Sequence, residues 1–248
     1  MSEAPAYRRE EYLICVLARM LQGLQHIAVG TSSPIPGCAA LLLQAENPGR
    51  VRAMMLGSNI HNSFNDGGPE VHDRAAQGRI DAFFLGGGQI DGEANINLVG
   101  IGAYPQSSVR FPGSYGSAFL YFLIPRVILF REEHSRRVFV PKVDFISAPG
   151  WSPPGIHRTG GPYALVTSLC VFMFDRVKHR FRLDSLHPGH TIEEVRDNTG
   201  FDFDCPQGVG QAAPPELDRL ALIRTRIARE IAEVYPQFAR TRLGLEAA

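Results

Sequence analysis

The chain has 248 residues, with 25 basic and 25 acidic side chains, a formal net charge of zero and 44% hydrophobic residues. This composition is typical of a globular protein and excludes an intrinsically disordered chain. Zero net charge argues against a nucleic-acid partner held by phosphate contacts, because such proteins carry a surplus of Lys and Arg.

The sequence predicts neither a membrane span nor a secretory signal. The longest apolar run, residues 118–130, is interrupted by Pro125 and Arg126, and it is shorter than the roughly 20 residues that a bilayer span needs. Charged residues at 8–11 precede the first apolar segment, unlike the pattern of a secretory signal. The four cysteines lie far apart without Cys-x-x-Cys spacing, so we expect no zinc site or disulfide framework and predict a cytoplasmic protein.

The first half of the chain alternates between helical and strand patterns. We predict helices over 8–24, 37–45 and 69–77, and strands over 26–30, 51–56 and 80–85. This alternation indicates a parallel α/β sheet, in which ligands bind at the carboxyl ends of the strands. The loops after Gly30, Leu56 and Leu85 are therefore the main lead toward a functional site.

The second half is β-rich, with segments predicted over 127–130, 137–147, 164–174, 181–186 and 201–204. Thr191 begins a capping-box sequence and predicts a short helix that ends near Gly200. Pro214 and Pro215 precede a long amphipathic helix predicted over about 214–236. We predict a single domain over residues 1–248.

Two glycine-rich loops are candidates for ligand binding. Gly86-Gly87-Gly88-Gln89 follows a predicted strand, and its amides can approach an anion or an oxyanion; the alternative is a tight turn between strands. Neither a dinucleotide fingerprint nor a P-loop is present. In the second loop, residues 112–117, Ser114 and Ser117 can donate hydrogen bonds. That loop lacks the Gly-x-Ser-x-Gly elbow of serine hydrolases.

The histidines predict no metal site. His187 and His190 are close in sequence, but a metal needs a third ligand, and the chain offers no clear carboxylate partner. A turn before the Thr191 cap is the better interpretation. His61 and His72 flank a loop and a helix, where an isolated histidine is usually solvated.

The order of the motifs resembles the β subunit of family I coenzyme A transferases, with the glutaconate CoA-transferase branch most similar. The resemblance covers about residues 10–225. The segments that carry it are residues 86–91 (GGGQID), 95–97 (NIN), 109–114 (VRFPGS), 136–150 (RRVFVPKVDFISAPG), 185–189 (SLHPG), 191–195 (TIEEV) and 198–201 (NTGF).

This resemblance implies a three-layer αβα fold of the CoA-transferase type, with a mostly parallel sheet and a β-rich second half. It also implies an α-subunit partner of related fold, often in an α2β2 assembly, with the active site between the two subunits. In the family, a β-subunit glutamate attacks the acyl-CoA thioester to give an anhydride, which CoA converts to a glutamyl-CoA thioester. The family loop that supplies amides to the oxyanion matches Gly113, Ser114, Tyr115, Gly116 and Ser117, where relatives usually have glycine at Tyr115 and alanine at Ser117.

The chain departs from the family at the nucleophile. Leu56 stands where the family has its glutamate, and a leucine side chain cannot form an acyl anhydride. We therefore assign no catalytic residue, although Glu70 and Glu93 are the nearest acidic alternatives in sequence. The resemblance further implies substrate or CoA contacts at Gly57, Ser58, Asn59, Gly87, Gly88 and Gln89.

Three functions remain open on the sequence alone. The first is CoA transfer between carboxylic acids, with acyl-CoA as substrate and no permanently bound cofactor. The second is hydrolysis of an acyl-CoA, including hydrolytic ring opening, with the catalytic carboxylate on the α subunit. The third is a binding subunit without catalytic activity. We expect no nucleic-acid or membrane partner for any of them.

Overall fold

The computed structural model describes residues 7–66 and 68–246, which divide into two compact units. The first unit combines the chain up to Val71 with the segment from Ala213 onward, and the second runs from His72 to Ala212. This division into units does not test the prediction of a single domain over residues 1–248, which stays a prediction. Among the described residues, no helix is both long enough and apolar enough to cross a membrane.

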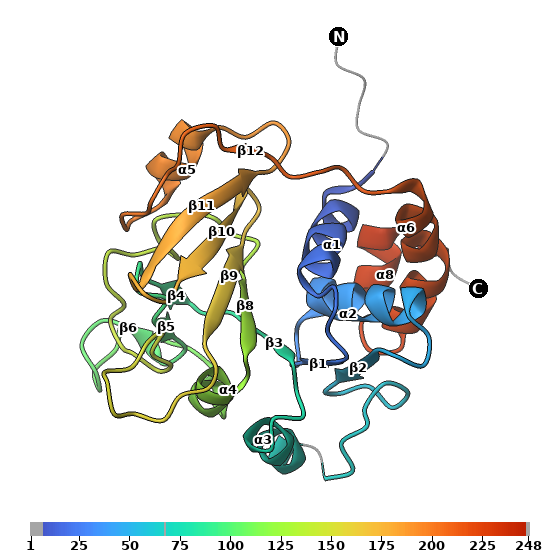
Figure 1. Cartoon of the computed structure of the whole chain (residues 1–248), viewed down its shortest axis with the longest axis horizontal. Coiled ribbons are helices and arrows are strands. Elements are labelled where there is room, and N and C mark those ends of the chain that lie inside the picture. Colours follow the sequence, from blue (N-terminus) through green and yellow to red (C-terminus); the bar gives the residue numbers. More distant parts are fainter. Residues whose placement is uncertain (1–6, 67, 247–248) are drawn as a thin grey trace. The chain divides into compact units, whose positions relative to one another are not determined.

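The first unit pairs two parallel strands and packs helices from both ends of the chain together (Figure 1). The strands are β1 (His26–Val29) and β2 (Arg52–Met55), with Ile27 opposite Ala53. The helices are α1 (Arg9–Met20), α2 (Pro34–Glu46), α6 (Leu217–Leu222), the π-helical turn η1 (Ile223–Ile227), α7 (Ala228–Ala232) and α8 (Pro236–Leu243). All three elements predicted between residues 8 and 45 are therefore present, with shifted ends.

Helix α2 is the centre of the first unit. Its residues from Ile35 to Leu43 are all buried, as expected for a helix that is apolar on every side and contacts α1, α7, β1 and β2. A Cβ at Gly37 would lie 3.0 Å from the Ile231 side chain and 3.1 Å from the Met55 side chain. Glycine at this position therefore allows the close approach of α2 to both β2 and α7.

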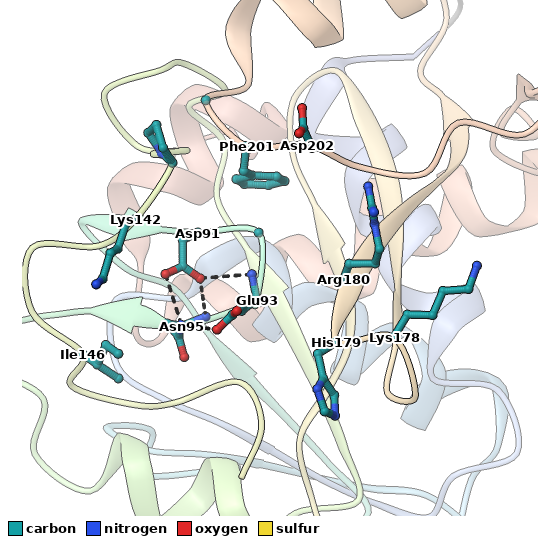
Figure 2. A pocket seen from close by; sticks show the side chains of 13 residues that line it. Asp91, Glu93, Asn95, Lys142, Ile146, Lys178, His179, Arg180, Phe201 and Asp202 are labelled. Atoms are coloured by element: carbon teal, nitrogen blue, oxygen red, sulfur yellow. Dashed lines mark hydrogen bonds between the residues drawn. The ribbon is translucent and has the colours of Figure 1, made fainter. Parts of the chain in front are cut away.

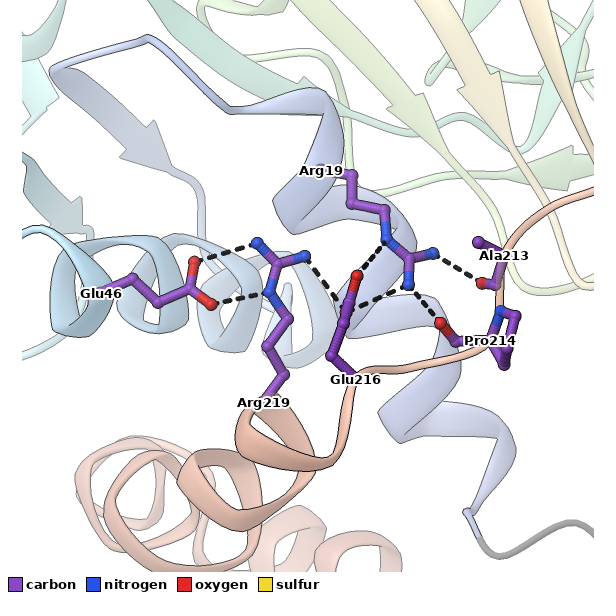
Figure 3. Close-up of polar contacts among 6 residues, drawn as sticks. All are labelled: Arg19, Glu46, Ala213, Pro214, Glu216 and Arg219. Carbon is purple, nitrogen blue, oxygen red and sulfur yellow. Dashed lines mark hydrogen bonds and ion pairs between the residues drawn. The ribbon is translucent and has the colours of Figure 1, made fainter.

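Ion pairs connect the C-terminal segment that begins α6 to helices α1 and α2 (Figure 3). The buried Arg219 guanidinium donates to both carboxylate oxygens of Glu46, at 2.6 and 3.0 Å. Arg19 donates to Glu216 and also to the backbone carbonyls of Ala213 and Pro214. Bidentate arginine pairs of this kind are stronger than single ion pairs and fix geometry.

The second unit contains one mixed sheet in the order β12-β11-β10-β9-β8-β3 (Figure 1). Its strands are β3 (Ala82–Leu85), β8 (Arg126–Phe130), β9 (Pro162–Val166), β10 (Cys170–Asp175), β11 (Arg180–Leu186) and β12 (Gly210–Gln211). The pairs β3–β8, β8–β9 and β11–β12 are parallel, whereas β9–β10 and β10–β11 are antiparallel. Parallel pairs thus predominate, and the β-rich second half is confirmed.

Two small ribbons and short helices complete the description of this part of the chain. The antiparallel ribbons are β4 (Gln89–Ile90) with β5 (Ile96–Asn97), and β6 (Gly100–Ile101) with β7 (Val109–Arg110). Helix α3 (Gly68–Ala76) crosses the division between the units, while α4 (Ser117–Leu123) and α5 (Ile192–Asn198) belong to the second. The predicted Thr191 cap is present, because the Glu194 backbone N–H donates to the Thr191 hydroxyl at 3.1 Å.

Several predicted elements differ from the structure. Residues 137–147 form no strand, because Pro141 lacks the N–H that a ladder requires. Isolated bridges at Phe139 and Ala148, together with hydrogen bonds of Asp144 and Ser147, connect this region to the β4–β5 ribbon. Residues 201–204 make one bridge, between Asp204 and Arg182, and no strand. The terminal helix ends before Pro236, which starts the additional helix α8.

Candidate active site

The loop after β2 begins at Leu56. Leu56 is half-buried, and its backbone N–H donates to the Val29 carbonyl at 2.9 Å. Gly57 is exposed, with φ of +88°, a conformation that glycine adopts without strain. Ser58 is buried and Asn59 is exposed. The chain therefore turns sharply at the end of the strand and presents Gly57 and Asn59 to solvent.

A carboxylate from the C-terminal helices holds this loop. Ser58 donates its hydroxyl hydrogen to Glu233 at 2.6 Å, and the Asn59 backbone N–H donates to the same carboxylate at 2.7 Å. The Ser58 hydroxyl oxygen accepts in turn from the backbone N–H groups of Ile60 and His61. Partial burial works to raise the pKa of Glu233, but the hydrogen bonds from Ser58 and Asn59 outweigh it, so that pKa is lowered. Glu233 was not among the residues predicted from sequence.

The loop after β3 requires its glycines for packing. A Cβ at Gly87 would lie 2.7 Å from the Ile96 side chain and 2.8 Å from the Gln89 carbonyl. A Cβ at Gly88 would lie 2.3 Å from the Phe111 ring. These contacts support the alternative interpretation of a tight turn, while a role of Gly87 and Gly88 in ligand binding stays a prediction.

Gln89 is the centre of a buried polar network. Its carbonyl oxygen accepts from the Asn97 side chain at 2.7 Å and from the Asp144 backbone N–H at 3.0 Å. Its amide nitrogen donates to the Asp144 carboxylate at 3.3 Å. The side chain, only 4% exposed, thus joins the β4–β5 ribbon to the 141–147 segment. Its predicted contact with substrate or CoA remains untested.

The second glycine loop, Gly113 to Ser117, has an unusual backbone. Gly113 has φ of +106° and Tyr115 has φ of +41°, which is uncommon for a residue with a side chain. The N–H of Gly113 donates to the Leu98 carbonyl, and the N–H of Ser117 donates to the Ser114 carbonyl. Within the part of the chain that the structure describes, the amides of Ser114, Tyr115 and Gly116 have no hydrogen-bond acceptor.

His72 packs against this loop and is not a freely solvated side chain. Its ring lies 5.4 Å from the Tyr115 ring and 5.5 Å from the Phe119 ring. Its Nε2 atom lies only 1.7 Å from the point that a Cβ at Gly116 would occupy. The sequence could not indicate this contact, because His72 and Gly116 belong to different helical segments of the chain.

A hollow of about 770 Å³ opens elsewhere in the second unit (Figure 2). Lys142 lies on one side of it and Lys178, His179 and Arg180 on the other. Its floor includes Asp91, whose pKa is raised by burial although it accepts hydrogen bonds from Asn95, Glu93 and Val143. The lining is Asp91, Gly92, Glu93, Asn95, Pro141, Lys142, Ile146, Lys178, His179, Arg180, Gly200, Phe201 and Asp202.

Glu93, one of the acidic alternatives, belongs to the rim of this hollow. Its carboxylate accepts from the Trp151 indole N–H at 3.0 Å, and the indole stacks on the His179 ring at 4.4 Å with an interplanar angle of 8°. Glu93 therefore orients Trp151 against the β10–β11 turn. Glu70, the other alternative, accepts from the backbone N–H groups of Asn65 and Asp66 and thereby holds the polypeptide ahead of α3.

The remaining histidine candidates are structural. His187 is buried and its Nε2 interacts with the Thr167 carbonyl at 2.9 Å, and burial lowers its pKa to about 4. The Nδ1 atom of His190 lies 2.9 Å from a carboxylate oxygen of Glu194, a residue in the first turn of the helix that Thr191 caps. Among residues 7–66 and 68–246, no group of three His, Cys, Asp or Glu side chains has the arrangement of a metal site.

Comparison with known proteins relates this fold to one enzyme family. Residues 11–198 match the coenzyme A transferase family. The chain is 36% identical over 160 residues to the B-type component of the 3-oxoadipate CoA-transferase of Pseudomonas knackmussii, a match that spans 61% of each chain. It is 27% identical over 242 residues to the B-type component of the glutaconate CoA-transferase of Acidaminococcus fermentans, covering 86% of this chain and 90% of that one.

The IpdB component of the cholesterol ring-cleaving hydrolase of Rhodococcus jostii is 33% identical over 159 residues, or 62% of each chain. The crystal structure of IpdAB from this organism superposes with a TM-score of 0.78 and 25% identity over 89% of this chain and 94% of that one. The glutaconate CoA-transferase structure superposes with a TM-score of 0.78 and 23% identity, covering 90% and 95%. These structures confirm the predicted three-layer αβα fold, and the chain belongs to the coenzyme A transferase family of enzymes.

Proposed function

We propose that this chain is the β-type subunit of a heteromeric enzyme that acts on acyl-CoA thioesters and transfers CoA between carboxylic acids. The observation that carries the proposal is the family match over residues 11–198, supported by a relative that aligns along 86% of the chain. Coenzyme A is then part of the substrate and no permanently bound cofactor is needed. An α subunit is the proposed partner, because the similar proteins are named as the B-type components of their enzymes.

The glycine loop over 113–117 is the proposed oxyanion site of this enzyme. The amides of Ser114, Tyr115 and Gly116 have no acceptor among the described residues, so they are available to a thioester oxygen. Amides that are already oriented stabilise the charge that develops on this oxygen during attack. Tyr115, in place of the glycine usual in the family, leaves its ring 80% exposed on this loop.

Leu56 is the proposed counterpart of the family nucleophile, so the attacking carboxylate comes from another residue. We propose that the α partner supplies it. Its oxygen attacks the thioester carbonyl carbon, the carbon–sulfur bond breaks and CoA leaves as the thiolate. In transfer, this thiolate next attacks the enzyme-side carbonyl of the anhydride, the first acid leaves, and a second acid then receives CoA by the same steps in reverse.

Hydrolysis is the second candidate, and the apolar Leu56 together with the IpdB relatives favours it. Here the partner carboxylate removes a proton from water, and the water oxygen bonds to a carbonyl carbon of the acyl-CoA. In the ring-opening type this carbon belongs to a ring ketone, the adjacent ring carbon–carbon bond breaks, the released carbon takes up a proton and CoA stays attached. In thioester hydrolysis the carbon–sulfur bond breaks instead and CoA departs as the thiolate. A binding subunit without activity is the third candidate. We also propose a cytoplasmic location, which four unpaired cysteines support.

The decisive experiment is co-expression with an α-subunit homologue encoded beside this chain, followed by assay of acyl-CoA consumption with and without added carboxylic acids. Transfer predicts consumption that depends on the acid and yields the new acyl-CoA. Hydrolysis predicts consumption without any added acid, giving a ring-opened acyl-CoA from a cyclic substrate or free CoA from thioester cleavage. A complex that neither consumes nor binds acyl-CoA, the latter measured by calorimetry, would refute both enzymatic proposals.

A further inference from the structure

Another cavity, of about 280 Å³, opens in the second unit beside the stacked rings of Trp151 and His179. Trp151 and Phe174 form part of its apolar lining, and Arg158 and Arg176 bring positive charge to it. No Asp or Glu is among its lining residues, all of which lie in the described part of the chain. Ligand pockets begin at about 300 Å³, so this volume suits a small molecule.

The two guanidinium groups converge on one peptide segment, Gly160-Gly161, which also lines the cavity. Arg158 Nε donates to the Gly160 carbonyl at 3.1 Å, and Arg176 Nη2 donates to the Gly161 carbonyl at 3.1 Å. The Arg158 guanidinium also lies against Gly161, because a Cβ there would be 3.4 Å from its Nη2 atom. Two positive charges from distant parts of the sequence are thus held close together on one wall.

No carboxylate balances these charges. Among residues 7–66 and 68–246, no Asp or Glu oxygen lies within 4.0 Å of either guanidinium. The hydrogen bonds of Arg158 and Arg176 go to backbone carbonyls and to the Ser152 hydroxyl, which are all neutral. Burial lowers the pKa of the half-buried Arg158, and the charge of Arg176 lowers it further. An anion at this place would relieve both effects.

Hydrogen-bond donors remain free at the cavity. Arg176 uses its Nε and Nη2 atoms for backbone carbonyls, while its Nη1 has no acceptor within the part of the chain that the structure describes. Ser152 accepts from Arg158 at 3.3 Å, and its own hydroxyl hydrogen has no acceptor among those residues. An N–H pair and an O–H are the donors that a carboxylate or phosphate oxygen accepts.

Arg158 is already held in place for such a ligand. Its guanidinium lies over the Phe122 ring, 4.6 Å from the ring centroid, and 5.2 Å from the centroid of the Tyr121 ring. Contacts between a guanidinium and aromatic faces are attractive and orient the planar group. A side chain fixed in this way loses little conformational freedom when it binds an anion.

The cavity is separate from the proposed oxyanion loop. Helix α4 begins at Ser117, at the end of that loop, whereas Arg158 Nη2 donates to the Tyr121 carbonyl near the other end of the helix. Pro162, the first residue of β9, lines the cavity, and its carbonyl accepts from Arg176 at 3.1 Å. The cavity therefore lies at the amino end of this strand, while ligands of parallel α/β sheets usually bind at the carboxyl ends.

We propose that this cavity binds a small organic anion, a carboxylate or a phosphate, through Arg158, Arg176 and Ser152, with the apolar part of the anion against Trp151 and Phe174. The planar guanidinium fork matches the oxygens of either anion. The aromatic lining favours an anion that carries an apolar group over a bare hydrated ion. This inference does not depend on the proposed function, because it concerns a different place in the second unit.

The test uses Trp151, the single tryptophan of the chain, as a fluorescent reporter of the cavity. The full-length chain is titrated at constant ionic strength with benzoate, phenyl phosphate and the uncharged benzamide. We expect saturable changes with both anions, with a Kd of about 1 mM or below, and none with benzamide. Tighter binding of phenyl phosphate assigns a phosphate ligand, and tighter binding of benzoate a carboxylate. No response to either anion, or an equal response to benzamide, would overturn the proposal.

Substitutions locate the bound anion. Arg158→Ala and Arg176→Ala should each weaken binding by about tenfold or more, because each removes a charged donor. Arg176→Lys keeps the charge without the fork and should weaken binding less. The exposed Arg79, which does not line the cavity, provides the matched control Arg79→Ala, with unchanged binding. Unchanged binding in both cavity variants would place the anion elsewhere and refute the assignment.

Two measurements on the unaltered protein cover an arginine variant that fails to fold. Benzoate or phenyl phosphate should raise the Tm at constant ionic strength, whereas benzamide should not. In the complex with the α partner, saturating butyryl-CoA should leave the calorimetric affinity for the anion unchanged. Displacement by butyryl-CoA would assign the anion to the acyl-CoA site and overturn the proposal. A complex that binds the anion but consumes no acyl-CoA would refute the proposed function alone.

Discussion

Ser58 donates a 2.6 Å hydrogen bond to Glu233, a residue 175 positions later in the chain. Together with the Asn59 amide, this bond ties the loop after β2 to the end of α7. The loop therefore depends on the C-terminal helices for its shape, although it looks like a local turn in the sequence. Glu233 is thus a positioning residue for the loop that begins at Leu56.

Replacing Glu233 tests this dependence. We expect Glu233→Ala to lower the free energy of unfolding by about 1–2 kcal/mol, because it leaves the buried Ser58 hydroxyl without its acceptor. Acyl-CoA turnover by the complex should fall as well, since the loop loses its anchor. Urea unfolding and kcat measure the two effects. Asp218→Asn, which removes an exposed carboxylate of α6, should change neither beyond about 0.5 kcal/mol or twofold.

Glu11 makes stability depend on pH. Its fully buried carboxylate accepts from Arg224 at 2.7 and 2.9 Å and from the Arg8 backbone N–H at 2.7 Å. Burial works to raise the pKa of Glu11, but these hydrogen bonds outweigh it and the pKa is lowered. A carboxyl with a lowered pKa stabilises the fold above its unfolded pKa of about 4.3, and loses this contribution as the pH falls through the folded value.

We therefore expect Glu11→Gln to lower the free energy of unfolding by about 2 kcal/mol at pH 7. The difference from the wild type should shrink as the pH falls below about 4. Urea titrations across this range measure it, with the exposed Glu193→Gln as control. A difference that stays constant with pH would show that charge is not its cause.

The backbone of another segment lies so close to Gly150 that position 150 has no space for a side chain. A Cβ at this position would lie 2.0 Å from the Glu93 carbonyl oxygen and 2.8 Å from Ala94 backbone atoms. Because backbone cannot move aside as a flexible side chain does, Gly150→Ala should cost about 3 kcal/mol of unfolding free energy. Gly210→Ala is the matched control, with nothing within 4 Å of the new Cβ, and should change stability by less than about 0.5 kcal/mol. Equal effects would contradict the steric argument.

The four thiols should differ in reactivity. Burial raises the pKa of Cys15 and of Cys170 to about 12, and it also raises the pKa of Cys38. Alkylation requires the thiolate, so these three should resist iodoacetamide at pH 8 in the native protein. Cys205, which is half-exposed, should be labelled first, as mass spectrometry of tryptic peptides would show. Labelling in urea should reach all four, and native labelling of Cys38 at the rate of Cys205 would refute the assignment.

Placing a carboxylate at position 56 tests the proposal that Leu56 occupies the place of the family's nucleophilic glutamate. We expect Leu56→Glu, in the complex with the α partner and acyl-CoA, to form a glutamyl-CoA thioester on this chain. Borohydride reduction and hydroxylamine cleavage, followed by peptide mass analysis, would locate it. Leu56→Gln has nearly the same size without the carboxylate and should form none. A glutamyl-CoA thioester found on the wild-type chain would refute the proposal that this chain carries no nucleophile.

Much of the fold follows from local patterns. The period of the apolar residues predicted α1, α2, β1 and β2 to within a few positions, because each pattern depends on neighbours in the chain. The prediction of a strand over 137–147 was wrong because it rested on the local pattern alone. The β-branched and aromatic residues of this segment resemble a strand, whereas Pro141 and the network around Gln89 hold it in an irregular path.

The sequence by itself determined the α/β class, the family and the positions of the glycine loops. Only the tertiary structure decided that Glu233 holds Ser58, that His72 lies against Gly116, and that Trp151 stacks on His179. Secondary structure and motifs depend on residues close together in the chain, which the sequence displays directly. These three contacts join residues 28 to 175 positions apart, so they follow from how helices and strands pack, which no local pattern encodes.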